Sequence, residues 1–238
     1  MSEVQTVAGA VENSASPAIA AIESLEGRFA NVLPAHVPPV KYKQWCLNLI
    51  RKAVDPGTTE QAAKQALAWQ RVLSSDQGRL SVYSALMEAA GLGLEPGREY
   101  HLVPYGGEVT GVTDYKGELR LIGNARRCSV IATLVREKDE FAMRGANCPP
   151  RHEADWFGSR GPVTGGYAYA DYGRGEYSLV VRMREAPDPD DPSADSFLHH
   201  REKAKTKIVW DEWPEAMRLK TLVHQLRKWV AWSPEWIA

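Results

Sequence analysis

The first ninety residues of the chain carry apolar side chains at helical spacing. The clearest set follows the i, i+3, i+4, i+7, i+8 pattern, which gives a helix one apolar face. Its members are Tyr42, Trp45, Cys46, Leu49 and Ile50. An earlier stripe begins after Ser16-Pro17, a pair that suits an N-cap and a first helical position. That stripe contains Ile19, Ile22, Phe29 and Val32.

Two more helices are predicted before the glycines at 91 and 93. Thr58-Thr59-Glu60-Gln61 resembles a capping box and opens a helix that runs to about Leu73. A further helix runs from Gly78 to Ala90 and stops at Gly91 and Gly93. Its apolar positions are Leu80, Tyr83 and Met87.

The middle of the chain shows the period of two that is typical of strands. Two apolar runs, 100–106 and 111–113, are joined through glycine and lead into a helix. Val163 to Tyr172 and Gly175 to Glu185 also alternate, and Gly173-Arg174-Gly175 between them predicts a hairpin. The apolar positions of the second run are Tyr177, Leu179, Val181 and Met183.

A final helix is predicted from about Trp213 to Trp232, with two different faces. One face is apolar and contains Leu219, Leu222, Val223, Leu226 and Val230. The other is basic and contains Lys220, His224, Arg227 and Lys228. The tryptophans are mostly assigned to the core, because Trp45 and Trp229 share helical spacing with other apolar residues.

Composition divides the chain into four segments. Residues 1–16 lack periodicity and are predicted to be a disordered tail. Residues 17–184 are predicted to form a helical N-terminal segment and a strand-rich core. An acidic, proline-rich linker follows at 185–200, and a basic helical segment that packs on the core occupies 201–238.

Charge and cysteine content exclude several classes of protein. The 238 residues have a formal net charge of −1, so a cationic surface must be local, and basic residues do cluster in 116–144 and 201–228. Three cysteines cannot form a disulfide framework in a chain of this length. The chain shows no signal peptide, and no apolar stretch approaches the roughly 20 residues that span a bilayer. We therefore expect a cytoplasmic protein without a membrane partner.

Clustered lysine and arginine suit phosphates, because each neutralised phosphate releases counterions without any reading of sequence. The first group of candidate binding residues is Tyr115, Lys116, Arg120, Arg126 and Arg127. The second is Lys203, Lys205, Lys207, Arg218, Lys220, His224 and Arg227. The competing interpretation is an ordinary solvated face, which the absence of acids between 218 and 228 disfavours. For Tyr115, base stacking and ordinary ring packing are equally consistent with the spacing.

Sequence motifs of enzymes are missing, and we expect no catalytic residues. Gly161 to Gly166 has the glycine spacing of a phosphate-binding loop, but Tyr167 stands where that loop needs lysine. Pro187-Asp188 is not followed by the Glu-x-Lys unit that a metal nuclease needs beside it. Cys148 and His152 lack the partners of a zinc site. We expect no resident metal or cofactor.

A set of short motifs then occurs in a definite order along the chain. The most specific is Ala-Ala-Gly-Leu-Gly-Leu-Glu-Pro at 89–96. The others are Leu33-Pro34-Ala35-His36, Ser81-Val82-Tyr83, Tyr115-Lys116-Gly117, Ala125-Arg126-Arg127, Val135, Asp139-Glu140-Phe141, His152, Tyr167-Ala168-Tyr169-Ala170, Met217, Lys220-Thr221, Leu226 and Lys228. Because these motifs occur in this order, the chain resembles the RecT family of phage single-strand annealing recombinases over residues of about 33–233. The family commonly has arginine where this chain has His224.

The resemblance implies an α+β fold, in which a small, mostly antiparallel sheet packs against helices, with an N-terminal helical segment and a C-terminal basic amphipathic helix. It implies ATP-independent binding of single-stranded DNA and annealing of complementary strands in phage-type recombination, by a homo-oligomeric ring or helical filament. The implied partners are single-stranded DNA, the annealed duplex, a phage exonuclease and the host single-strand binding protein. Mg²⁺ is expected only to modulate DNA binding.

Two other hypotheses remain open at this stage. One is a self-assembling structural protein whose basic face binds acidic protein segments, such as its own linker at 185–195. The other is a nuclease of the same recombination module, against which the missing metal set argues.

Overall fold

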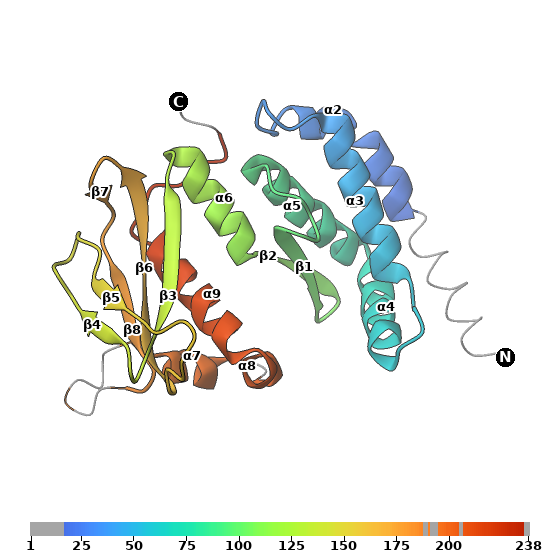
Figure 1. Ribbon diagram of the computed structural model, residues 1–238. Helices are drawn as coiled ribbons and strands as arrows, with labels where there is room; N and C mark the ends of the chain where they lie inside the picture. Colours follow the sequence, from blue (N-terminus) through green and yellow to red (C-terminus); the bar gives the residue numbers. More distant parts are fainter. Residues whose placement is uncertain (1–16, 188–189, 191–194, 205–206, 236–238) are drawn as a thin grey trace. The chain divides into compact units, whose positions relative to one another are not determined.

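The structure is a computed structural model (Figure 1). It describes residues 17–187, 190, 195–204 and 207–235. The predicted tail at 1–16 therefore lies outside the described residues, as does much of the acidic linker. Predictions for those segments stay predictions.

The chain forms two compact units, Met1–Gly117 and Glu118–Ala238. Each combines helices with small antiparallel sheets, so the predicted α+β class is confirmed. None of the helices in the described part of the chain has the length and apolar character that crossing a bilayer requires.

Helices dominate the first unit. Residues 17–24 are helical, and α2 Glu26–Ala30, α3 Pro39–Val54, α4 Glu60–Leu73 and α5 Asp76–Leu92 follow. The strands β1 Tyr100–Tyr105 and β2 Glu108–Thr113 pair antiparallel and confirm the predicted glycine-linked strand pair. The next helix, α6 Tyr115–Ala125, starts in the first unit and continues into the second.

Side-chain caps and glycine define the ends of these helices. The Thr59 hydroxyl accepts a hydrogen bond from the Ala62 N–H at 3.1 Å, so the predicted start of α4 is confirmed. Ser75 caps α5 in the same way through the Gly78 N–H at 3.0 Å. The helix α5 ends at Gly93, whose φ of 67° is the left-handed conformation that favours glycine.

The apolar face predicted for α3 is buried at Tyr42, Cys46 and Ile50, while Trp45 and Leu49 are half-buried. The earlier stripe is buried at Ile22 and Phe29. Val32 is 40% exposed, contrary to the prediction, because α2 ends at Ala30.

The apolar face predicted for α5 is wrong at Leu80, while Tyr83 and Met87 are half-buried. Leu80 is 58% exposed, whereas Val82 and Leu86 are fully buried. The reason is Gly78, because a Cβ there would lie 2.0 Å from the Val72 carbonyl oxygen and 2.7 Å from that of Gly107. The close approach directs the helix face that contains Gly78 inward, and Leu80 therefore points to solvent.

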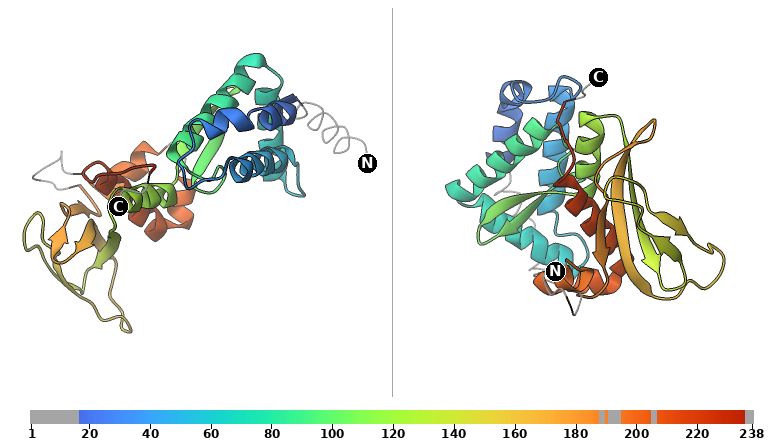
Figure 2. Two further views of the ribbon diagram at one scale, coloured as in Figure 1. Left: turned by 90° about the horizontal axis from the view of Figure 1, so that it is seen from above. Right: turned by 90° about the vertical axis from the view of Figure 1, so that its left-hand side faces the viewer.

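The second unit is built on an antiparallel sheet. Its strands are β3 Ser129–Arg136, β6 Val163–Gly173, β7 Glu176–Tyr177 and β8 Val181–Arg184, and β6 pairs with each of the others. A separate hairpin is formed by β4 Glu140–Ala142 and β5 Arg151–Glu153. The helices α7 Phe197–Lys203, α8 Ile208–Glu212 and α9 Pro214–Arg227 follow, and α9 packs against β3, β6 and β8 (Figure 2).

The contact between α9 and the sheet depends on a glycine in β6. Leu222 and Leu226 of α9 are fully buried in one core with Ala168. A Cβ at Gly166 would lie 2.9 Å from a Leu222 methyl carbon and 3.0 Å from the Thr133 carbonyl oxygen. This glycine therefore allows α9 to pack closely on β6. Gly166 is the second glycine of the spacing that resembles a phosphate-binding loop, and its role here is in packing.

The hairpin predicted after Val163 is confirmed, but its second strand is interrupted. Ser178 donates its N–H to the Ala170 oxygen at 2.8 Å, and its hydroxyl accepts from the Ala170 N–H at 2.6 Å. The Val180 N–H bonds to the Ala146 oxygen instead of to β6. Consequently Ser178 and Val180 are buried and Leu179 is 37% exposed, which reverses the predicted alternation at 178–180. In β8 the prediction holds, because Met183 is buried between exposed Arg182 and Arg184.

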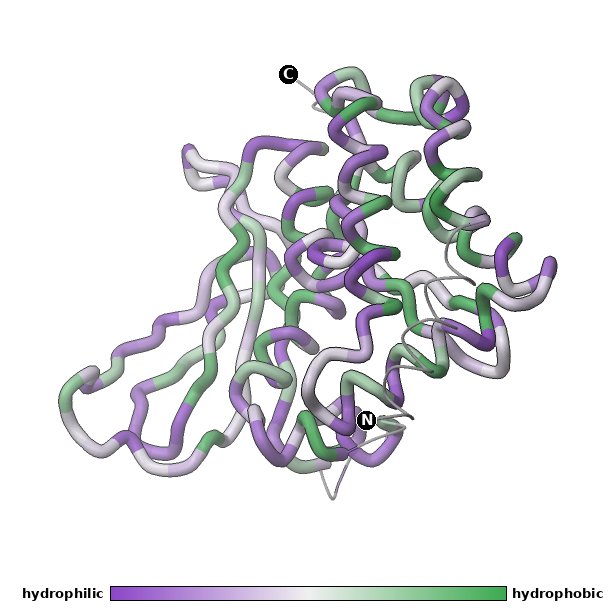
Figure 3. The backbone as a smooth tube through the Cα atoms, turned by 90° about the vertical axis from the view of Figure 1, so that its right-hand side faces the viewer, coloured by the Kyte–Doolittle hydropathy of each residue, from purple (hydrophilic) through white to green (hydrophobic). Residues whose placement is uncertain are grey.

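The prediction that the tryptophans lie mostly in the core is wrong for the described residues. Trp69 and Trp210 are buried. Trp156, Trp213, Trp229 and Trp232 are 73%, 65%, 66% and 46% exposed. Trp229 follows the end of α9, so helical spacing no longer sets its direction. Figure 3 shows how hydrophobic and hydrophilic stretches alternate along the backbone.

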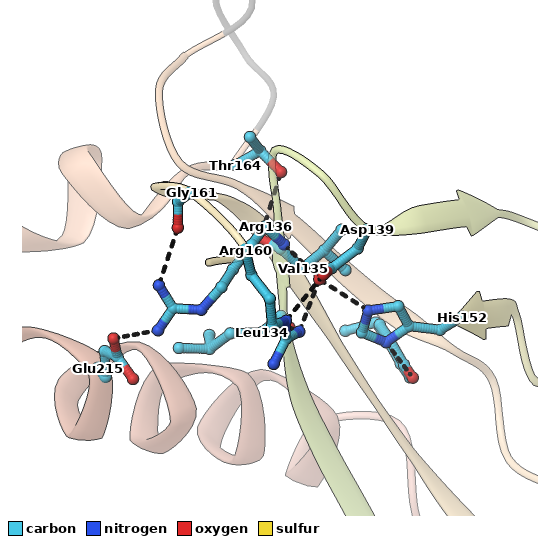
Figure 4. Close-up of polar contacts among 10 residues, drawn as sticks. Leu134, Val135, Arg136, Asp139, His152, Arg160, Gly161, Thr164 and Glu215 are labelled. Carbon is cyan, nitrogen blue, oxygen red and sulfur yellow. Dashed lines mark hydrogen bonds and ion pairs between the residues drawn. The ribbon is translucent and has the colours of Figure 1, made fainter. Parts of the chain in front are cut away.

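A buried carboxylate, that of Asp139, joins the end of β3, strand β5 and the loop before β6 (Figure 4). Asp139 has a fully buried side chain and binds Arg160 through two hydrogen bonds, of 2.8 and 2.6 Å. His152 Nε2 lies 3.0 Å from the same carboxylate, and the Arg136 N–H donates to it at 2.7 Å. The Arg160 guanidinium therefore holds the pKa of Asp139 far below its ordinary value.

Asp139→Asn should lower the free energy of unfolding at pH 7 by about 2 to 3 kcal/mol, because Arg160 would lose its counter-ion in a site that is mostly closed to water. A lowered folded pKa stabilises the protein above the ordinary pKa of 3.8, and this stabilisation is lost as the pH falls below it. The gap between the two proteins should therefore shrink on acidification below about pH 4. Urea unfolding followed by circular dichroism measures both effects.

Glu153→Gln is the matched control, because the Glu153–Arg151 pair is largely exposed and its loss should change the stability little. Equal stability of Asp139→Asn and wild type at pH 7 would contradict the assigned role.

Candidate functional site

The helix α9 presents a basic face to solvent. Its apolar residues Leu222 and Leu226 are buried, while Lys220 and His224 are exposed, as the two-faced pattern predicts. The helix ends at Arg227, five residues before the predicted end, and Lys228 forms its C-cap.

Acidic side chains from other elements reach this basic face. Glu118 of α6 is buried, and its carboxylate oxygen lies 2.8 Å from His224 Nδ1 and 3.3 Å from an Arg227 guanidinium nitrogen. Arg218 forms two hydrogen bonds with Glu185, which follows β8. No sequence spacing could show these partners, because they are more than thirty residues away along the chain.

The segment after α9 adds aromatic rings beside the basic face. The Arg227 guanidinium lies 5.1 Å from the centre of the Trp232 ring. The Ser233 N–H donates to the Leu121 oxygen at 3.0 Å, and the Asn124 side chain donates to the Pro234 oxygen at 3.3 Å. These bonds fix the segment on α6, and they leave large parts of the Trp229 and Trp232 rings exposed. Neither ring was predicted as a site residue from the sequence. Their position directly after a basic helix is the sequence feature that could have indicated this role.

The Ala125-Arg126-Arg127 segment lies at the end of α6. Arg126 is exposed, with its guanidinium 4.4 Å from the centre of the Tyr172 ring, and it forms an ion pair with Glu176. Arg127 is also exposed, and Arg120 on α6 is partly buried.

The remaining candidates lie on other elements of the fold. Tyr115 and Lys116 open α6 and belong to the first unit, with the Lys116 ammonium 6.0 Å from the centre of the Tyr115 ring. Lys203 ends α7 and is exposed, while Lys207 pairs with Glu202. Lys205 lies outside the described residues. The structure thus brings Lys220, His224 and Arg227 together on one helix face of the second unit.

This surface suits a polyanion that carries flat rings. Lysine and arginine attract phosphates, and exposed indole rings stack on bases of any sequence. Among the residues that the structure describes, no cluster of three or more His, Cys, Asp or Glu side chains could hold a metal ion.

Comparison with known protein families gives a match over most of the chain. The sequence model of the RecT family matches residues 61–235, which is most of the chain. No curated protein matches the chain.

Glu118→Gln tests how far this buried carboxylate weakens the basic face. The glutamine keeps the shape of the side chain and one acceptor oxygen but removes a negative charge beside Arg227. We expect affinity for a single-stranded oligonucleotide to rise about two- to fivefold at low salt, with a steeper salt dependence. Fluorescence anisotropy across a salt series measures both.

Glu153→Gln serves again as the control, since it removes an exposed carboxylate that is paired with Arg151. Weaker binding by Glu118→Gln would show that Glu118 acts mainly by holding Arg227 in position.

Proposed function

Because this chain belongs to the RecT family, whose proteins anneal single strands in DNA recombination, we propose that the basic face of α9 holds single-stranded DNA and that annealing needs no ATP. The observation that supports this placement is the joint exposure of Lys220, Trp229 and Trp232 beside Arg227. Such a surface neutralises a phosphate backbone and stacks on its bases without preference for sequence.

Annealing requires no chemical energy from a nucleotide. Each base-pair step of a DNA duplex contributes about 1.4 kcal/mol of stacking, so pairing of complementary strands is favourable by itself. The barrier lies in bringing two polyanions together and in keeping their bases unpaired with themselves. A protein that neutralises phosphates and holds the backbone extended lowers this barrier and then leaves the duplex to form.

The proposed function requires more than one subunit. The 14 residues of α9 span about 21 Å, which is far shorter than a recombination substrate. Subunits joined head to tail would extend the face into a ring or a helical filament. A phage exonuclease that produces single strands and the host single-strand binding protein are the proposed partners, and the cytoplasm is the proposed location. We propose no cofactor, with Mg²⁺ acting only on DNA binding.

One observation favours the second candidate, a structural protein whose basic face binds acidic protein segments. Arg218 is bound to Glu185, at the start of the acidic stretch, and Glu118 occupies His224 and Arg227. If acidic segments of the chain neutralised every cation of this face, the face would not bind DNA.

An annealing assay separates the two candidates. Two complementary fluorescent oligonucleotides are mixed with the protein and without nucleotide, in parallel with chelator and with Mg²⁺. We expect faster annealing than without protein in both conditions. Absence of binding at low salt would favour the structural protein, and metal-dependent degradation of the strands would indicate a nuclease.

Salt dependence and stacking can be measured separately. Replacing Lys220 and Arg227 by alanine should weaken binding and reduce the slope of log affinity against log salt by up to about 0.7 per lost phosphate contact. Trp232→Ala should weaken binding by about 1 to 3 kcal/mol with little change in slope, because stacking releases no counterions. Arg151→Ala, which removes an exposed arginine of the β4–β5 hairpin, is the control. Normal binding by the Lys220/Arg227 variant would show that α9 is only scaffold.

A further inference from the structure

Among the described residues of the second unit, the loop between β5 and β6 carries the most exposed aromatic side chains. Phe157 has an exposure of 103%, and its neighbour Trp156 is 73% exposed. Neither residue takes part in the α9 face. Exposed adjacent aromatic side chains of this size mark an interaction surface, because burying them would release water from a large apolar area.

The tip of this loop, Asp155 to Gly158, has a defined conformation. One Asp155 carboxylate oxygen accepts hydrogen bonds from the N–H groups of Phe157 and Gly158, both at 3.0 Å. The Arg160 guanidinium lies 5.0 Å from the centre of the Trp156 ring and is bound to the buried Asp139. The backbone of the tip and the Trp156 ring are thus held in place before any partner binds, which reduces the entropy lost on docking.

Charge next to the tip disfavours DNA as its partner. Asp155 is exposed and lies beside the aromatic pair, whereas the charge of Arg160 is neutralised by Asp139. A phosphate backbone would be repelled by Asp155. An apolar surface with a cation at its edge, on a protein, has the complementary chemistry.

The first unit contains a partly apolar surface with two cations among its lining residues, Lys52 and Arg98, of which Arg98 is paired with Glu95 at 3.6 Å. Two adjoining hollows, of about 200 and 170 Å³, are both lined by Leu49, Lys52 and Gly97. Trp45 lines one hollow and Trp69 the other. Each is smaller than a typical small-molecule pocket and has the scale of an inserted side chain. Lys52 is exposed and has no ion-pair partner among the described residues.

We propose that the aromatic tip of one copy of the chain, Asp155 to Gly158, docks into the Lys52 hollow of a second copy. Phe157 and Trp156 would cover Leu49 and Trp45, and Asp155 would lie near Lys52. Two different surfaces meet in this contact, so it is heterologous and can repeat from subunit to subunit. The inference rests on the proposed self-assembly and names the residues that produce it.

The experiment uses full-length protein and two complementary variants. Phe157→Ala removes the tip ring without affecting any buried group, and Lys52→Glu reverses the charge at the hollow. Each should raise the dissociation constant of the subunit contact at least about tenfold, as expected for interface hot spots. Sedimentation velocity without DNA and electron microscopy on long single strands report assembly. Anisotropy with a short oligonucleotide reports DNA binding by one subunit.

Each variant has a matched control. Trp213→Ala removes another exposed aromatic ring of the second unit. Arg51→Glu makes the same charge change in the last turn of α3, one residue from Lys52, but Arg51 does not line either hollow. Both controls should assemble as wild type does.

The mixture of the two variants gives the sharpest result. Phe157→Ala keeps its hollow and Lys52→Glu keeps its tip, so the mixture should form dimers with one subunit of each, while each variant alone stays monomeric. Short-oligonucleotide binding should be unchanged. Normal assembly of both variants overturns the inference and leaves the annealing function intact. Weaker oligonucleotide binding by Phe157→Ala with normal assembly also overturns it, because the tip would then contact DNA.

Discussion

The close approach of α9 to strand β6 at Gly166 is the contact on which the second unit depends. A Cβ at that position would crowd a Leu222 methyl group and the Thr133 carbonyl oxygen, so glycine here favours the close approach of the helix. Leu222 and Leu226 then fill the core, and the opposite side of α9 is fixed toward solvent. The direction of Lys220 and His224 is thus a consequence of how the helix packs.

The basic face is moderated by the same fold that creates it. Glu118, Glu185 and Glu176 each neutralise at least one of the arginines or histidines in the candidate groups. A protein that anneals strands benefits from this restraint, because it must release the duplex that it forms. Stacking of bases on exposed tryptophans adds affinity for single-stranded DNA that depends little on salt concentration. DNA binding then needs fewer contacts between cations and phosphates.

The local patterns of the sequence predicted much of the fold. Threonine at 59, glycine at 93 and the two faces of α9 act through neighbours within a few residues, and each was predicted correctly. The errors have tertiary causes. Leu80 is exposed because Gly78 approaches the β1–β2 turn, and Leu179 is exposed because Ser178 replaces a ladder bond with a side-chain bond. Likewise, Glu118 could not be predicted as a partner of α9, because it lies more than 100 residues before His224 in the sequence and only the fold brings the two together.

Photochemical cross-linking tests the central claim, that single-stranded DNA lies on the basic face of α9, most directly. A single-stranded oligonucleotide that carries a photoreactive pyrimidine is irradiated with the full-length protein, and the linked peptides are identified by mass spectrometry. We expect the dominant cross-links on Trp229 and Trp232. The Trp232→Ala variant should lose the cross-link at position 232. Dominant cross-links on Tyr169 and Tyr177 of the sheet, with none after residue 213, would contradict it.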